Sequence, residues 1–146
     1  MASVRGRILS LMTSVQNINP FAHPDAVAKM KKMSEKYLEV KLPKGYSLEK
    51  KTTGNGTAYV CLQRNGCKNA KKAIYYLHGG CYICGLTNNY HSFLREFCDL
   101  EDGVTVVLLD YKTAPEYKYP VQLNEALDLW DELTENQDYR AENIVI

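Results

Sequence analysis

The run AIYYLHGGCYICG, residues 73–85, decides the fold class. Its first five residues form a short apolar stretch typical of a strand buried on both faces of a sheet, and His78 with two glycines ends that stretch. Paired glycines let backbone amides turn toward a cavity without obstruction by side chains. Such amides can bind an anion or a developing oxyanion, so the run predicts a strand followed by a binding loop.

The patterns on either side of this run predict a mixed sheet. An apolar helical pattern at 90–100 and a β-branched strand at 104–109 follow it, and the order strand, helix, strand predicts a parallel pair. Upstream, turn residues at 53–56 between two alternating stretches predict an antiparallel hairpin. Residues 142–146 read as a further strand. The fold class expected is therefore α/β, with a mostly parallel sheet and an N-terminal hairpin.

Helices are expected in two further places. Near the N-terminus, apolar residues recur at helical spacing over 3–15 and again from Pro24 to Leu38. Between the strands at 104–109 and 142–146, a helix is expected to turn a leucine-rich stripe toward the core. The residues of that stripe are Leu123, Ala126, Leu127, Trp130 and Leu133.

Composition excludes several classes of protein. The 146 residues are 45% hydrophobic and 24% charged, which describes a globular domain. No stretch approaches the roughly 20 apolar residues that a membrane span requires, and no secretory signal is recognisable, so no membrane span is expected. Five cysteines, an odd number, favour reduced thiols over a disulfide framework and hence a cytoplasmic location.

The near-neutral net charge of +1 hides an uneven distribution. Residues 1–72 carry 14 basic and 4 acidic side chains, whereas residues 73–146 carry 4 basic and 13 acidic ones. A basic half can indicate a nucleic-acid partner, but no basic motif interleaved with aromatic residues is present. We expect two solvated surfaces and no binding of nucleic acid.

A second motif, DYKTAPEYKYP at 110–120, directly follows the strand expected at 104–109. Together with residues 73–85 and the final ENIVI, it closely resembles the hormone-sensitive-lipase-like branch of the α/β-hydrolases, carboxylesterases that act on acyl esters. The resemblance implies an α/β-hydrolase fold fragment, in which residues 1–44 form N-terminal cap helices and residues 45–146 the incomplete first half of the core. It also implies a small acyl ester as substrate and no cofactor.

The resemblance assigns roles to residues of both motifs. The amides of Gly80 and Cys81 would be two donors of an oxyanion hole, with Cys81 standing where the family usually has a third glycine. Other residues would support this loop rather than act in catalysis, His78 by ordering it and Asp110 and Glu116 by fixing backbone. The supporting residues are His78, Gly79, Asp110, Tyr111, Pro115 and Glu116.

The catalytic triad of the family is not found in this sequence. The family carries its nucleophile in Gly-x-Ser-x-Gly just after the strand expected at 142–146, and Ile146 falls a few positions short of it. No serine of the sequence has that glycine frame, and neither His23 nor His91 lies in the context of the family's base. We therefore expect the N-terminal half of an esterase, truncated before the nucleophile and inactive alone.

Three alternatives remain open. His78, Cys81, Cys84 and His91 offer ligand types that suit zinc. Cys81 and Cys84 also form a C-x-x-C pair of the redox type. The strand at 142–146 would leave a sheet edge open, which favours a non-catalytic chain that pairs with a separately encoded second half or with another copy.

Overall fold

The computed structural model describes most of the chain from the second expected helix onward. The described residues are 25–35, 44–67, 70–100, 103–136 and 139–146. The helix expected at 3–15 lies outside them, and so does much of the expected cap at 1–44. In the described part, no helix is long and apolar enough to cross a bilayer.

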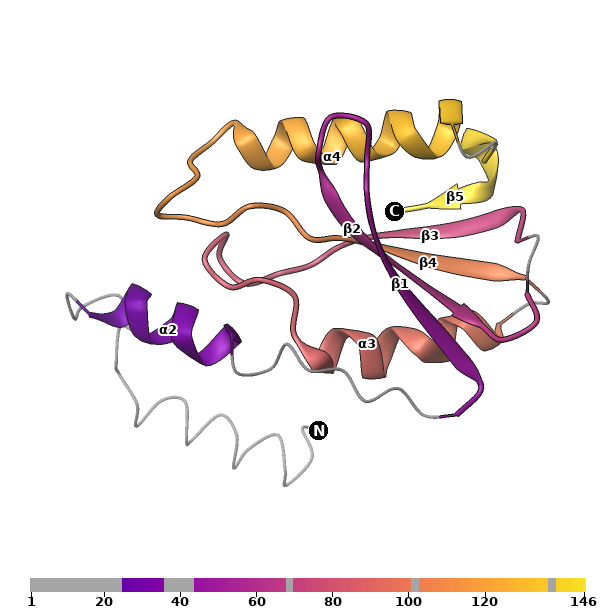
Figure 1. Cartoon of the computed structure of the whole chain (residues 1–146), viewed down its shortest axis with the longest axis horizontal. Coiled ribbons are helices and arrows are strands. Elements are labelled where there is room, and N and C mark those ends of the chain that lie inside the picture. The colour runs from indigo at the N-terminus through magenta and orange to yellow at the C-terminus, as the bar shows by residue number, and fades with distance from the viewer. Residues whose placement is uncertain (1–24, 36–43, 68–69, 101–102, 137–138) are drawn as a thin grey trace, which may run out of the picture.

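Three helices and five strands are described (Figure 1). The helices are α2 (Ala26–Glu35), α3 (Asn88–Leu94) and α4 (Val121–Asp131). The strands are β1 (Tyr46–Thr52), β2 (Ala58–Arg64), β3 (Lys72–Leu77), β4 (Val104–Leu109) and β5 (Ile144–Val145). Short turns of 3₁₀-helix at Arg95–Asp99 and Ala141–Asn143 and a π-helical turn at Glu132–Asn136 complete the described elements.

The strands form one mixed sheet in the order β1-β2-β4-β3-β5. β1 with β2 and β2 with β4 are antiparallel, whereas β3 pairs in parallel with both β4 and β5. The mixed sheet, the hairpin and the parallel pair predicted from the sequence are thus confirmed. Among the described strands the two kinds of pairing are equal in number, against the expected parallel majority.

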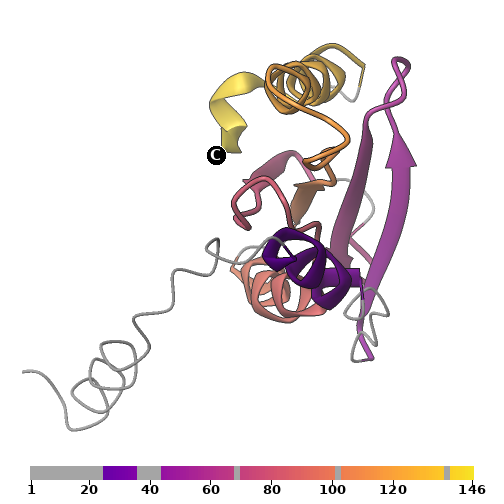
Figure 2. The same cartoon turned by 90° about the vertical axis from the view of Figure 1, so that its left-hand side faces the viewer.

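The core lies on both faces of the sheet, because every residue of the β-branched strand β4 is buried. Figures 1 and 2 show α4 on one face and α2 and α3 on the other. On the first face Val107 and Leu109 pack with Leu129 of α4, and on the other Val106 and Leu108 pack with side chains of the α3 region. The sheet is therefore covered on both faces, and its strand ends are left for a site.

The leucine stripe expected on α4 is wrong at two positions. Leu123 and Leu127 are 47% and 55% exposed, whereas Glu125, Leu129 and Leu133 are buried. These three buried residues are four positions apart, as expected for one helix face, but the first of them, Glu125, is acidic. Glu125 is buried because its carboxylate accepts a hydrogen bond from the Lys112 amide at 2.8 Å.

The tip of the hairpin is tied to α4 by one carboxylate. The side chains of Thr53 and Asn55 both donate hydrogen bonds to Asp128. Burial would raise the pKa of Asp128, but the hydrogen bonds from Thr53, Thr57 and Asn55 lower it below its ordinary value. The turn between β1 and β2 is therefore attached to α4, the helix that covers one face of the sheet.

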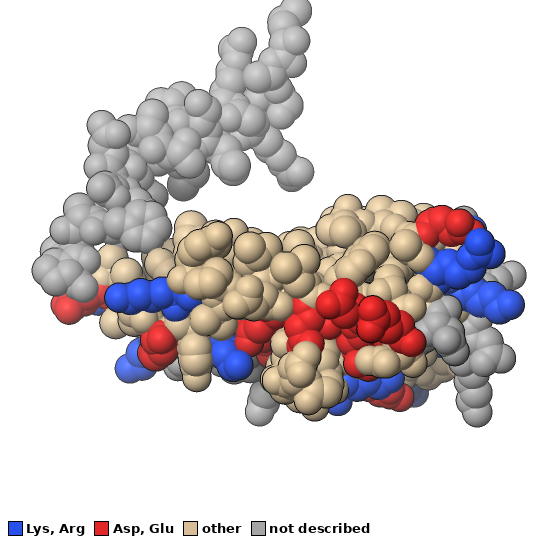
Figure 3. Space-filling model, turned by 90° about the horizontal axis from the view of Figure 1, so that it is seen from above, with Lys and Arg blue, Asp and Glu red and all other residues tan. Residues whose placement is uncertain are grey.

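Acidic side chains gather on the face that carries α4, with basic side chains toward the ends of that face (Figure 3). This distribution follows from the acidic excess of residues 73–146. A phosphate backbone would be repelled there. The absence of a nucleic-acid partner stays a prediction.

Candidate active site

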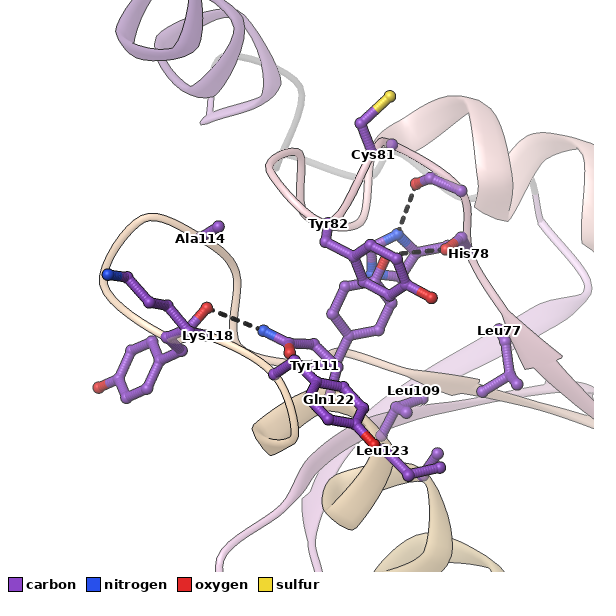
Figure 4. Close-up of a pocket in the computed structure, with 15 residues that line it drawn as sticks. Leu77, His78, Cys81, Tyr82, Leu109, Tyr111, Ala114, Lys118, Gln122 and Leu123 are labelled. Carbon is purple, nitrogen blue, oxygen red and sulfur yellow. Dashed lines mark hydrogen bonds between the residues drawn. The ribbon is translucent and has the colours of Figure 1, made fainter.

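A pocket of about 770 Å³ lies at the carboxyl ends of β3 and β4 (Figure 4). Three segments line it, namely the residues that follow β3, the residues that follow β4, and the first turns of α4. Ligand sites of open α/β sheets lie at this edge because the connecting loops meet there. The two sequence motifs are therefore brought together around one cavity.

The turn after β3 requires a glycine at residue 80. Its φ is +130°, and a Cβ built there would lie 2.9 Å from Cβ of Cys84. The Gly80 carbonyl accepts the amides of Ile83 and Cys84, each at 3.0 Å. Cys81 and Tyr82 follow with φ of 56° and 58°, a left-handed conformation that favours glycine. The chain thus keeps a backbone suited to glycine at Cys81 despite the side chain.

The amides of Gly80 and Cys81 are donors without a partner in the described part of the chain. The hydrogen bonds of this turn that involve Gly80 use only its carbonyl, and Gly80 and Cys81 both line the pocket. An unpaired backbone donor beside a cavity can bind an oxygen atom of a ligand. The arrangement can therefore stabilise negative charge on an oxygen.

His78 is held from three sides. Its Nδ1 lies 2.8 Å from the Gly79 carbonyl, and its ring stacks on Tyr111 with 4.1 Å between centroids and 5° between planes. The Tyr111 hydroxyl donates to the His78 carbonyl at 2.8 Å, and the Tyr90 hydroxyl donates to the Gly79 carbonyl at 3.0 Å. Burial lowers the pKa of His78, which favours the neutral imidazole. These contacts tie His78 and Gly79 to Tyr111 and Tyr90, and the loop-ordering role that the resemblance implies for His78 stays a prediction.

The loop after β4 supports the turn by direct contact. The Ala114 amide donates to the Tyr82 carbonyl at 2.8 Å, just before a cis bond to Pro115. Glu116 instead reaches α2, where its carboxylate pairs with Lys31, and the hydrogen bond from Lys31 lowers the pKa of Glu116. The Glu116 carboxylate thus joins this loop to α2 and also accepts a hydrogen bond from its own backbone.

Asp110 begins the same loop. Its amide donates to the Ala58 carbonyl at 3.0 Å, which continues the β2–β4 pairing. The residue as a whole is exposed, but its carboxyl group is partly buried. This loss of hydration raises the pKa of Asp110 by more than the nearby basic groups of His78 and Lys50 lower it. The Leu86 backbone also bonds to this carboxyl group. Asp110 therefore touches the backbone of the segment after β3, as a supporting residue would.

Comparison with known proteins identifies the fold. A family model described as "alpha/beta hydrolase fold" matches residues 74–146, half of the chain. The chain belongs to this family. An ethyl acetate hydrolase of Pseudomonas putida is 32% identical over 69 residues, which are 47% of this chain and 21% of that protein. Lipase 2 of a Moraxella species is 31% identical over 81 residues, 52% of this chain and 18% of that protein.

Solved structures agree with this α/β-hydrolase assignment. The esterase EstE5, soaked with ethyl alcohol, superposes with a TM-score of 0.73 at 26% identity, covering 98% of this chain and 46% of that one. An esterase/lipase from an uncultured bacterium gives the same TM-score and identity, with 98% and 47% coverage. The chain spans about half the length of these solved hydrolases.

Two residues that hold the loop after β4, Glu125 and Gln122, escaped the sequence analysis. Glu125 accepts the Lys112 amide at 2.8 Å and the Lys112 ammonium at 3.0 Å. Gln122 donates to the Lys112 carbonyl at 2.8 Å. Both backbone polar groups of Lys112 are thus held by α4. A signal for Glu125 was present in the sequence, because Glu125 lies four residues before Leu129 and eight before Leu133 and so falls on the same face of the helix.

The structure does not assemble the alternative zinc set. Among the described residues, which include His78, Cys81, Cys84 and His91, no three His, Cys, Asp or Glu side chains form a group that could hold a metal. Cys84 Sγ lies 3.9 Å from the Met30 carbonyl of α2. Figure 4 shows the Cys81 sulfur pointing away from the leucines of the pocket. Cys81 and Cys84 are both free thiols, so no disulfide supports the redox alternative.

Proposed function

We propose that residues 1–146 supply the oxyanion-hole half of a serine carboxylesterase for small acyl esters. The observation that carries the proposal is the pair of unpaired amides at Gly80 and Cys81, two residues that line a pocket at the carboxyl edge of the sheet. A small ester fits the name of one relative, an ethyl acetate hydrolase. The free cysteines favour a cytoplasmic setting.

The proposed chemistry is acyl transfer. When a nucleophile adds to the ester carbonyl, its oxygen becomes an oxyanion, and the amides of Gly80 and Cys81 would donate hydrogen bonds to it. Loss of one such donor costs about 2.7–4 kcal/mol of transition-state stabilisation. His78 and Tyr111 would hold the loop that carries these donors without exchanging protons with the substrate.

The nucleophile would come from a second segment, because residues 1–146 contain no Gly-x-Ser-x-Gly. β5 offers the place for it. β5 pairs with β3 in parallel, with Ala73 opposite Ile144 and Ile74 opposite Val145. In the same register, a residue three positions after Val145 would lie beside Leu77, next to the turn that carries the amides. A nucleophile there would share the pocket with both donors.

The test joins residues 1–146 to the remaining half of the esterase/lipase from the uncultured bacterium, whose chain this one covers to 47%. We expect the chimera to hydrolyse p-nitrophenyl acetate in a phosphonate-sensitive reaction. We expect residues 1–146 alone to match the buffer rate, because loss of a triad serine costs about 10⁶ in turnover. A folded but inactive chimera, or a phosphonate-sensitive burst from residues 1–146 alone, would overturn the proposal.

A second candidate function is a non-catalytic chain that pairs with a partner. The observation that favours it is the exposure of the apolar side chains at and directly after β5, Val145 and Ile146, which are 66% and 73% exposed. Exposed apolar surface beside an edge strand favours association. Analytical ultracentrifugation tests this candidate, since a monomer that binds no apolar dye would contradict it.

A further inference from the structure

Beyond the two amides, the pocket has a wall of two chemical kinds. An aliphatic part is formed by Leu77, Leu109, Leu123 and Ala126. An aromatic part is formed by Tyr82, Tyr111, Tyr117 and Tyr119. Figure 4 shows Leu77, Leu109 and Leu123 gathered at one end of the site and the Tyr82 ring over Tyr111 at another. The cavity therefore offers separate surfaces to two parts of a ligand.

Three of the four tyrosine rings have much of their surface free. Tyr82, Tyr117 and Tyr119 are 63%, 45% and 80% exposed, although all three line the same concave surface. Large aromatic side chains grouped around a cavity mark a binding surface more often than isolated exposed rings do. Their hydroxyls donate no hydrogen bond to any residue in the described ranges. The three hydroxyls are thus available to a ligand, and so are the faces of Tyr82 and Tyr119, whereas the Lys112 ammonium lies over the Tyr117 ring, 5.5 Å from its centroid.

Two rings of the aromatic part, Tyr82 and Tyr111, are also held in place. Tyr111 is buried and stacked on His78, and the Tyr82 ring lies 5.9 Å from Tyr111 at 51°. The Tyr82 carbonyl accepts the amide of Ala114, which joins the two loops that carry these rings. Side chains that are ordered before binding lose little conformational entropy when a ligand arrives. Tyr82 and Tyr111 are therefore ordered before a ligand binds.

We infer that this pocket takes an ester bearing an aromatic ring, with the ring against Tyr82, Tyr117 and Tyr119 and the remaining apolar part against the leucines. The inference deepens the proposed function and rests on it. A planar ring gains edge and face contacts with the tyrosines in addition to burial of its area. A saturated ring or a linear chain of similar size gains burial only. The substrate class is thus an aryl or arylalkyl ester.

The test compares benzyl acetate with cyclohexylmethyl acetate, two esters with the same skeleton that differ in the aromaticity of the ring. Both are titrated into residues 1–146 and their dissociation constants are measured by NMR. We expect benzyl acetate to bind about 3–10-fold more tightly, since an aromatic pair adds this much to affinity. Equal affinity, or no measurable binding of benzyl acetate up to its solubility limit, would overturn the inference.

Variants locate the effect. Tyr119→Leu is expected to remove most of the preference for benzyl acetate, whereas Tyr119→Phe keeps it, and Tyr117→Leu provides a second test at a separate ring. Phe93→Leu is the matched control, because Phe93 is an exposed aromatic residue of α3 outside the pocket. The inference is wrong if Tyr119→Leu and Tyr117→Leu both behave like Phe93→Leu.

The outcomes separate this inference from the proposed function. An inactive chimera together with a preference for benzyl acetate that depends on Tyr119 would contradict the esterase proposal but support the aromatic site. An active chimera together with equal affinities would leave the esterase proposal intact and overturn the aromatic site.

Discussion

The two loops that follow the neighbouring strands β3 and β4 differ in how their backbones are used. After β3, the amides of Gly80 and Cys81 are unpaired within the described residues and the backbone is left-handed. After β4, both polar groups of Lys112 are bonded to α4, and the Tyr111 hydroxyl and the Ala114 amide hold the other loop. The loop after β3, which has free amide donors, is thus held by the loop after β4, whose own backbone at Lys112 is bonded to α4.

Replacing Gly80 would break the first loop and should have the largest effect. In Gly80→Ala the new Cβ would lie 2.9 Å from Cβ of Cys84 at a φ of +130°, so the clash and the backbone strain add. We expect a loss of about 2–3 kcal/mol in the free energy of unfolding, measured with urea. Gly85→Ala is the control, since no atom lies within 4 Å of a Cβ built there. Equal losses for the two variants would contradict the prediction.

Removing one hydroxyl would test the support that the second loop gives. Tyr111→Phe leaves the carbonyl of buried His78 without the hydrogen bond that it accepts at 2.8 Å. We expect a loss of about 1–2 kcal/mol in unfolding free energy. Tyr82→Phe removes a hydroxyl that has no hydrogen-bond partner among the described residues and should change little. If both variants unfold at the same urea concentration, Tyr111 does not support the loop through its hydroxyl.

A change at Cys81 should give the smallest effect, and it is a gain. A residue with a Cβ in the left-handed conformation destabilises the folded state by about 1–2 kcal/mol. Glycine avoids this strain, but its more flexible unfolded chain offsets about 0.5–1 kcal/mol of the gain in stability. Cys81→Gly should therefore stabilise the protein by about 0.5–1 kcal/mol, measured as a raised urea midpoint. Cys81→Ala keeps the Cβ and should be near neutral. Stabilisation by both variants would point to the thiol instead of the backbone.

The sequence predicted those parts of the fold that depend on local pattern. β4 and the hairpin were recognisable because their apolar runs and turn residues are contiguous. The stripe of α4 was not, because Leu123 and Leu127 outrank Glu125 on any hydrophobic scale. Glu125 is buried for a partner 13 residues away, the Lys112 amide, and a helical pattern carries no information about such a contact.

In the candidate site, too, features that depend on local sequence were predicted and features that depend on distant contacts were not. The turn at Gly80 was predicted from its motif, and the left-handed φ of Cys81 suits the glycine that the family resemblance implies at this position. Glu116 was predicted to fix backbone, and its carboxylate does bond to its own backbone, but it also pairs with Lys31, which lies 85 positions earlier in the chain. Ion pairs over such separations depend on how the layers pack, so no local motif reveals them.

The bond between Asp128 and the hairpin tip has a consequence for how the protein opens. α4 holds the tip through Asp128 and the pocket loop through Glu125, and the two acids lie three residues apart on one helix. Fluctuations that detach this helix would release the outer sheet edge and the ligand cavity together. Amide exchange at the two places should accordingly be slowed or accelerated in step, as parts of one cooperative unit.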